Sequence, residues 1–223
     1  MQIWLIVLIV TVVDAKAQER VDLKLVLAID CSYSVDATEF DLQIHGTAAA
    51  FTNPAIIGAI TSGKYGKIAI AVIQWSNTRN QIVTVPWAII SGQIDAYKLA
   101  VAIKSQTRKT AEGATSISTA IDKAANMLLS APYQADRMVI DIAADGENNA
   151  GERVERVRDK TVRLGITING LSILNEVGYL NYYFQNRVIG GEGAFVQIAN
   201  SYGDFGKAIR KKLLREILGN GVS

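Results

Sequence analysis

The stretch Leu23-Lys-Leu-Val-Leu-Ala-Ile-Asp-Cys-Ser-Tyr-Ser34 decides the fold, because an apolar run ends in a cluster of oxygen-bearing side chains. Residues 23–29 are apolar enough to form a buried strand. Asp30, Ser32 and Ser34 then place an acid and two hydroxyls at alternate positions after that strand. Oxygen side chains gathered at a strand end suit a hard divalent cation such as Mg²⁺, which binds about six oxygens and keeps several waters. The stretch therefore predicts a metal site at the end of a strand.

Two later segments offer further oxygen ligands. Gly113-Ala-Thr115 opens a predicted helix, and Asp145-Gly146 ends a second apolar run over residues 138–144. If the two apolar runs form neighbouring parallel strands at the point where the strand order reverses, both acids lie in the crevice where open α/β sheets bind ligands. We therefore expect Thr115 and Asp145 beside Asp30.

Strand and helix patterns alternate along the rest of the chain, which predicts an α/β fold. We expect a doubly wound, mostly parallel open sheet with one antiparallel edge strand and helices on both faces. Asp36 and Glu39 form a capping-box pattern, and Asn53-Pro54 is expected to end the helix that follows them. The expected strands are 23–29, 67–75, 81–87, 138–144, 166–173 and 194–198. The expected helices are 37–51, 94–103, 116–129, 152–164 and 204–218, with a short helix or loop at 179–185.

The oxygen-bearing residues resemble the metal-ion-dependent adhesion site of von Willebrand factor type A (VWA) domains. That family has Asp-x-Ser-x-Ser, then a distant Thr and a distant Asp. The five matching residues occur in the same order: Asp30, Ser32, Ser34, Thr115 and Asp145. The resemblance extends over residues 21–217. Tyr33 departs from it, because the family usually has Gly there, and its ring would narrow access to the metal or form part of the ligand surface.

Three further segments are similar to a bacterial branch of VWA-like proteins, the domain of unknown function 1194. They are Asp145-Gly-Glu-Asn-Asn149, Gly165-Ile-Thr-Ile-Asn-Gly170 and Val188-Ile-Gly-Gly191. This similarity supports the fold and assigns no biological role.

The VWA resemblance implies a role for each matching side chain. Ser32, Ser34 and Thr115 would contact the ion directly, while Asp30 and Asp145 would balance its charge and anchor hydrogen bonds, often through water. The implied ion is Mg²⁺ or Mn²⁺. Hydroxyl ligands leave such an ion undercompensated, so it would attract an Asp or Glu carboxylate of a protein partner.

Other side chains near these positions are expected to form the rim of the site. Tyr33, Glu147 and Asn148 are the candidates for contacting the ligand. Consecutive asparagines in a loop also tolerate left-handed backbone, which is an alternative reason for Asn148 and Asn149. Tyr179, Tyr182 and Tyr183 are expected either to form a contact patch or to pack half-buried.

Two alternatives compete with the adhesion-type interpretation. The polar residues could simply cap the turns and helices that follow them, which would make the protein a metal-free structural or assembly module. A metal-dependent hydrolase on the same sheet is the other alternative. Residues 58–64 match a phosphate-loop pattern, but Tyr65 replaces the required Ser or Thr and a strand follows, so we reject a phosphate-binding loop there and keep the metal-dependent hydrolase as an alternative.

The first residues are typical of an export signal. Residues 3–13 form an apolar run of 11, shorter than the span of about 20 that crosses a bilayer, and Ala15-Lys16-Ala17 follows as a cleavage site. We expect residues 1–17 to be a signal peptide and 18–223 to be a single VWA-like domain. The protein would then be periplasmic or secreted, with no integral membrane span after cleavage.

Charge and cysteine content limit the remaining possibilities. The net charge of +2 is too small to predict a nucleic-acid partner. A single cysteine, Cys31, excludes an intramolecular disulfide, and we expect it to fill space beside the strand. The last predicted helix is basic, and its cations are expected to be solvated: Lys207, Arg210, Lys211, Lys212 and Arg215.

Overall fold

A six-stranded sheet forms the centre of the computed structural model, which describes residues 18–219. The strand order is β3-β2-β1-β4-β5-β6, and every neighbouring pair is parallel except β2 and β3. This confirms the predicted mostly parallel sheet with an antiparallel edge strand. The strands are β1 (Glu19–Asp30), β2 (Ile68–Trp75), β3 (Gln81–Ile90), β4 (Tyr133–Ala144), β5 (Thr167–Ile173) and β6 (Val196–Ala199).

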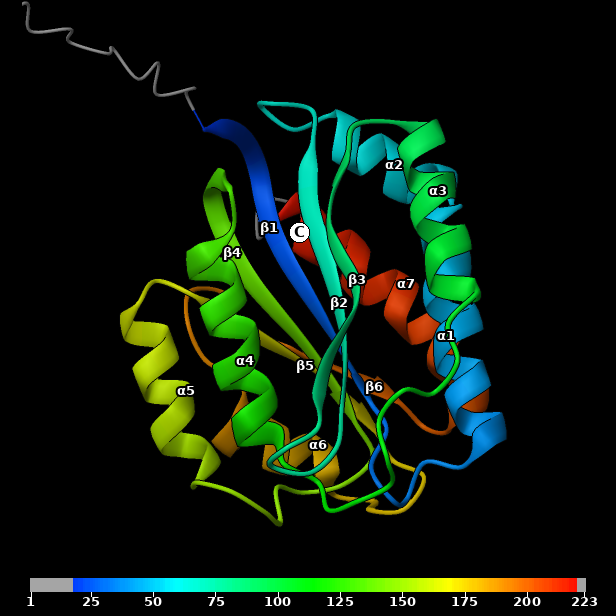
Figure 1. The fold of residues 1–223 in the computed structure, drawn as a ribbon, viewed down its shortest axis with the longest axis vertical. Coiled ribbons are helices and arrows are strands. Elements are labelled where there is room, and N and C mark those ends of the chain that lie inside the picture. Colours follow the sequence, from blue (N-terminus) through cyan, green and yellow to red (C-terminus); the bar gives the residue numbers. More distant parts are fainter. Residues whose placement is uncertain (1–17, 220–223) are drawn as a thin grey trace, which may run out of the picture.

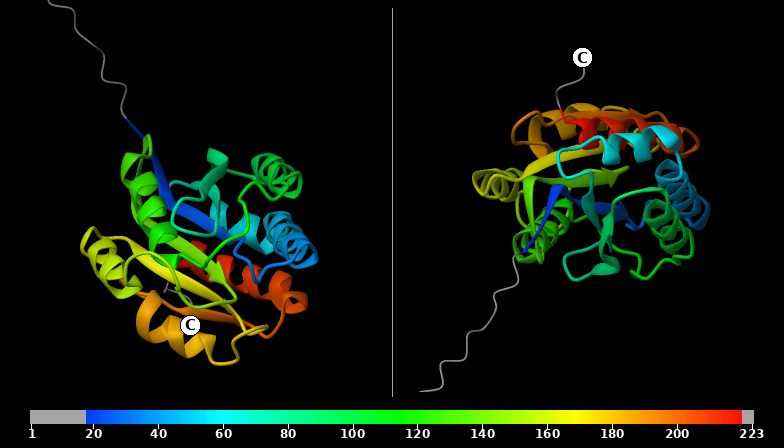
Figure 2. Two further views of the ribbon diagram at one scale, coloured as in Figure 1. Left: turned by 60° about the horizontal axis from the view of Figure 1, so that its bottom comes forward. Right: turned by 90° about the horizontal axis from the view of Figure 1, so that it is seen from above.

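Helices cover both faces of this sheet (Figures 1 and 2), as the doubly wound prediction requires. One buried cluster joins the sheet to α1 (Ala37–Phe51), α2 (Pro54–Thr61), α3 (Gln93–Lys104) and α7 (Tyr202–Leu218). A second cluster lies on the other face, against α4 (Ile117–Ser130), α5 (Val154–Arg163), α6 (Leu180–Tyr183) and the π-helical turn η1 (Phe184–Val188).

Helix α1 has the predicted bounds because its start is specified by side-chain caps. The Asp36 carboxylate accepts the backbone N–H of Glu39 at 2.8 Å, and the Glu39 carboxylate accepts that of Asp36 at 2.9 Å. Helix α2 was not predicted. Asn53 was interpreted only as the end of α1, yet its side chain accepts the Ala55 N–H at 2.9 Å and Pro54 occupies the first turn of a new helix.

One cation of α7 lies in the core instead of in solvent. Lys212 is fully buried, and its Nζ lies 2.7 Å from Asp141 Oδ1 and 2.5 Å from Glu216 Oε1. Asn169 Nδ2 also donates to Glu216 Oε1, at 2.9 Å. The prediction of a solvated Lys212 was therefore wrong, because a buried acid on β4 and another on α7 hold its charge. The other four basic residues of this helix are exposed.

The strand order places the ends of β1 and β4 side by side. These strands pair in parallel, with Val26 opposite Ile140 and Ala28 opposite Ile142. The chain turns to opposite sides of the sheet on leaving them, so a crevice forms beyond their carboxyl ends. Among residues 18–219, no helix is long and apolar enough to span a membrane. The predicted signal peptide, residues 1–17, lies outside the described residues.

Candidate metal centre

Two buried carboxylates stand at the crevice between β1 and β4. Asp30 is the last residue of β1 and Asp145 directly follows β4, and both are 0% exposed. The serine hydroxyls lie between these acids. Ser34 Oγ donates to Asp145 Oδ1 at 2.7 Å and lies 3.3 Å from Ser32 Oγ. The backbone N–H of Ser32 donates to Asp30 Oδ1 at 2.7 Å. The predicted Asp-x-Ser-x-Ser segment and Asp145 therefore form one connected cluster.

Thr115 reaches the same place from the segment that precedes α4. Its N–H donates to Asn149 Oδ1 at 2.8 Å, and the Asn149 N–H donates to the Thr115 carbonyl at 2.9 Å. The Thr115 hydroxyl oxygen lies 3.6 Å from the point that a Cβ on Gly146 would occupy. Thr115 is thus packed against the loop that follows Asp145, and the structure brings all five predicted residues together.

The electrostatics of the cluster favour a cation. Burial, followed by repulsion from the nearby Asp145 carboxylate, raises the pKa of Asp30 to about 7. Burial likewise raises the pKa of Asp145. Asp30 Oδ2 is buried without a hydrogen-bond partner, and neither acid forms an ion pair within residues 18–219. This donor set suits a hard divalent ion, because it combines three hydroxyls with two acids, one of which has a buried oxygen without a hydrogen-bond partner.

The metal-type donors here are hydroxyls as much as acids. The described part of the chain contains no group of three or more His, Cys, Asp or Glu side chains that could hold an ion. An ion at this cluster would therefore depend on Ser32, Ser34 and Thr115. Cys31 is buried beside it, and burial raises the pKa of its thiol to about 12, so the thiol stays protonated.

Several contacts that hold the cluster have no signal in the sequence. Gln43 Nε2 of α1 donates to the Asp30 carbonyl at 3.0 Å. Arg108 Nη2 donates to the carbonyls of Cys31 and Ser32 at 2.8 and 2.9 Å. The Tyr202 hydroxyl, at the start of α7, donates to Asp145 Oδ2 at 3.0 Å. These donors fix the backbone of the serine loop and one oxygen of Asp145.

The rim residues divide into exposed and engaged side chains. Tyr33 is 79% exposed above the serine loop. Asn148 instead holds its own loop: its Oδ1 accepts the Ser118 N–H at 2.9 Å, and its Nδ2 donates to the carbonyls of Ala150 and Glu152. Within residues 18–219 no residue other than Gly has positive φ, so the left-handed explanation for Asn148 and Asn149 was wrong. Glu147 is half-buried and lines the adjacent cleft.

A family model described as "Protein of unknown function (DUF1194)" matches residues 20–221. The chain belongs to this family. No curated protein is similar enough to this DUF1194 chain to count as a relative.

Solved structures show that the fold is that of a VWA domain. Proximal thread matrix protein 1 from the mussel byssus, in a form with a zinc-occupied MIDAS motif, gives a TM-score of 0.61 at 15% identity. That match covers 90% of this chain and 48% of the mussel chain, so the DUF1194 chain spans about half of that protein. The von Willebrand factor type A protein from Catenulispora acidiphila gives 0.55 at 16% identity, with 91% and 44% covered. Manganese-loaded TRAP protein from Plasmodium vivax gives 0.56 at 13% identity, with 89% and 74% covered.

Proposed function

We propose that this DUF1194 protein binds a protein partner through a divalent cation held at the ends of β1 and β4. The observation that carries the proposal is the pair of buried acids, Asp30 and Asp145, which form no ion pair within residues 18–219 and lie beside the hydroxyls of Ser32 and Ser34. Mg²⁺ or Mn²⁺ would supply the missing positive charge. Similar folds with zinc-occupied and manganese-loaded sites support this choice of chemistry.

The hydroxyl residues and the acids would have different roles at the ion. Ser32, Ser34 and Thr115 would give the ion neutral oxygens, while Asp30 and Asp145 would supply negative charge close by. Neutral ligands leave positive charge on the ion, and a carboxylate of a partner Asp or Glu is the commonest protein group that can meet it. The ion would supply Lewis-acid attraction for that carboxylate. The hydrogen bond from Tyr202 to Asp145 would keep one acid oxygen in place.

We also propose that the protein acts outside the cytoplasm after cleavage behind Ala17. The support is the apolar run and the Ala-Lys-Ala site at the start of the sequence. Similar folds in a pilus adhesin from Lactobacillus rhamnosus GG and in a mussel byssus protein are consistent with an exported role. N-terminal sequencing of protein from outside the cytoplasm should begin at Gln18, and intact Met1 on cytoplasmic protein would refute this part.

The binding proposal is tested by a pull-down from native envelope extract with and without EDTA. The test compares wild type with the combined Ser32→Ala and Ser34→Ala variant, and a matched control changes Ser105 and Ser130, which are exposed at helix ends. The same partner should be captured by wild type and the control, and lost with EDTA or with the site variant. Capture that survives both treatments would favour a metal-free module. Turnover of a phosphoester or peptide by the metal-loaded protein would favour a hydrolase.

A further inference from the structure

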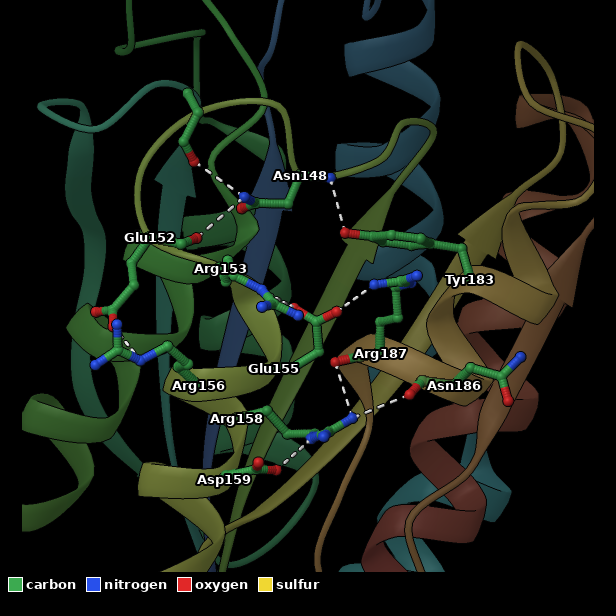
Figure 3. A network of polar contacts seen from close by, with 11 residues as sticks. Asn148, Glu152, Arg153, Glu155, Arg156, Arg158, Asp159, Tyr183, Asn186 and Arg187 are labelled. Atoms are coloured by element: carbon green, nitrogen blue, oxygen red, sulfur yellow. Dashed lines mark hydrogen bonds and ion pairs between the residues drawn. The ribbon is translucent and has the colours of Figure 1, made fainter.

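A cleft of about 600 Å³ opens beside the candidate metal centre. One wall is the loop after Asp145 together with the first turn of α5, and the other is the segment containing α6 and η1 (Figure 3). Clefts of this size accommodate several side chains of a ligand or partner. Tyrosine, arginine and asparagine side chains make up much of its lining.

The α6–η1 wall presents a single helical face to the cleft. Its lining residues follow spacings of three and four: Tyr179, Tyr182, Tyr183, Asn186 and Arg187. Tyr179 is 61% exposed and Tyr182 is 66% exposed, whereas Tyr183 is half-buried and its hydroxyl accepts the Asn148 N–H at 3.2 Å. The sequence left open whether these tyrosines pack or make contacts. Two of the three rings are available to a partner.

Two arginines, Arg187 from the α6–η1 wall and Arg153 from the opposite wall, meet one acid. Arg187 Nη1 bonds to Glu155 Oε1, and Arg153 Nε lies 3.8 Å from Glu155 Oε2 (Figure 3). The side chains of Arg153 and Arg187 are 75% and 54% exposed. Hydrogen bonds lower the pKa of Glu155, so its carboxylate stays ionised and the trio carries one net positive charge. Most N–H donors of the two guanidinium groups remain free for an incoming acceptor.

The other acidic residues of the lining do not neutralise the positive charge at Arg153 and Arg187. Glu152 pairs with Arg156 at 3.2 Å on the outer side of α5. Glu147 lines the cleft two residues after Asp145. The positive charge of the cleft is therefore concentrated at Arg153 and Arg187.

One loop residue, Asn149, links the cleft to the metal centre. Asn149 lines the cleft, and its side chain accepts the N–H of Thr115, one of the proposed metal ligands. A chain segment seated on the ion could thus run directly into the cleft. Tyr and Arg are the residue types that contribute most to binding energy in protein interfaces, which favours a polypeptide as the occupant.

We propose that this cleft is the second half of the partner site, and the inference rests on the proposed metal-dependent function. A partner segment would place one acid on the ion. Further along the same segment, an aromatic side chain would lie against Tyr179 and Tyr182, and a second carboxylate would meet Arg153 and Arg187. The ion alone cannot distinguish one acid from another, so the cleft supplies the selectivity.

A library of random linear peptides displayed on phage tests this inference. The full-length protein is panned in Mg²⁺, and enriched peptides are then measured against two cleft variants, Tyr179→Ala/Tyr182→Ala and Arg153→Ala. Matched controls are Tyr97→Ala on α3 and Arg163→Ala at the far end of α5, both exposed positions. Circular dichroism checks folding, and Arg153→Ala removes a side chain that is 75% exposed, so the fold should tolerate it.

The expected peptides carry two acids and an aromatic residue, and they lose about tenfold or more in affinity for each cleft variant but not for the controls. Peptides that need Mg²⁺ but ignore the cleft variants would overturn the inference and leave the proposed function standing. Peptides that need the cleft but not Mg²⁺ would support a cleft site and contradict the metal-dependent function. Failure to enrich any peptide, or selective binding of glycans instead, would overturn the inference.

Discussion

Replacing Lys212 by Met should be among the most damaging single changes in the core. Lys212 is fully buried and is the cation that bonds to both Asp141 and Glu216, which are each 2% exposed. Met fills a similar volume, so the change removes charge with little change in packing. Two buried carboxylates are then left without their ammonium group. Breaking a buried ion pair in this way costs about 3–5 kcal/mol.

The free energy of unfolding is measured by urea titration at pH 8, with far-UV circular dichroism as the signal. Lys211→Met is the matched control, because Lys211 is the preceding residue of the same helix and is exposed. We expect the control to stay within about 0.5 kcal/mol of wild type. Breaking a buried pair should lower the unfolding free energy by about 3–5 kcal/mol, so a loss below about 1 kcal/mol for Lys212→Met would refute the buried ionic cluster.

Three further changes have expected outcomes. Burial, followed by repulsion from Asp141, raises the pKa of Glu216 from 4.5 to about 7 despite the bonds from Lys212 and Asn169. The folded state therefore favours the protonated form of Glu216, and stability present below pH 4.5 is lost as the pH rises through about 7. Glu216→Gln should flatten this decline in urea titrations between pH 4.5 and 8, and an unchanged slope would contradict it. Asp36→Ala should lower the unfolding free energy by about 1 kcal/mol through loss of the α1 cap, and no change would contradict the capping role. Gly170→Ala should lower the unfolding free energy by about 1–3 kcal/mol, because the new Cβ would lie 2.3 Å from the buried Phe184 ring. The control Gly58→Ala has open space around it and should not lower this free energy. Equal melting temperatures for the two variants would contradict the close packing at Gly170.

The sheet and its metal end could be predicted because their signals are local. The apolar runs of β1 and β4 each end at an acid, and parallel strands bring such ends to one edge of a sheet. Helix α1 has its predicted bounds because Asp36 marks its start and Asn53-Pro54 follows its end. The same Asn-Pro pair also starts α2, and the sequence alone did not separate the two uses.

The missed features depend on contacts between distant segments. Lys212 belongs to a basic helix, and the strand acid that buries it, Asp141, lies some seventy residues earlier. The sequence predicted a helix over residues 204–218 but not the partner of a cation on that helix. Neighbouring sequence cannot show which acid a buried lysine will meet, so the solvated interpretation was the natural one.

The candidate site likewise contains residues that the sequence predicts and supporting contacts that it does not. The five hydroxyl and acid positions follow from a spacing pattern, whereas the groups that hold them are side chains bonded to remote backbone. Gln43, Arg108 and Asn149 bond to backbone groups of the serine loop, the β1 end or the Thr115 segment. Such contacts depend on the folded geometry and leave no periodic signal in the sequence.

Calorimetric titration of the protein with Mg²⁺ and with Mn²⁺ tests the central claim most directly. Wild type is compared with Asp145→Ala and with the matched control Asp95→Ala, whose half-buried acid lies in the first turn of α3 and bonds to Ser91. The account predicts binding of a single ion by wild type and the control, and at least about tenfold weaker binding by folded Asp145→Ala, the equivalent of 1.4 kcal/mol or more. Equal binding by all three proteins, or no binding by wild type, would contradict a metal centre at the ends of β1 and β4.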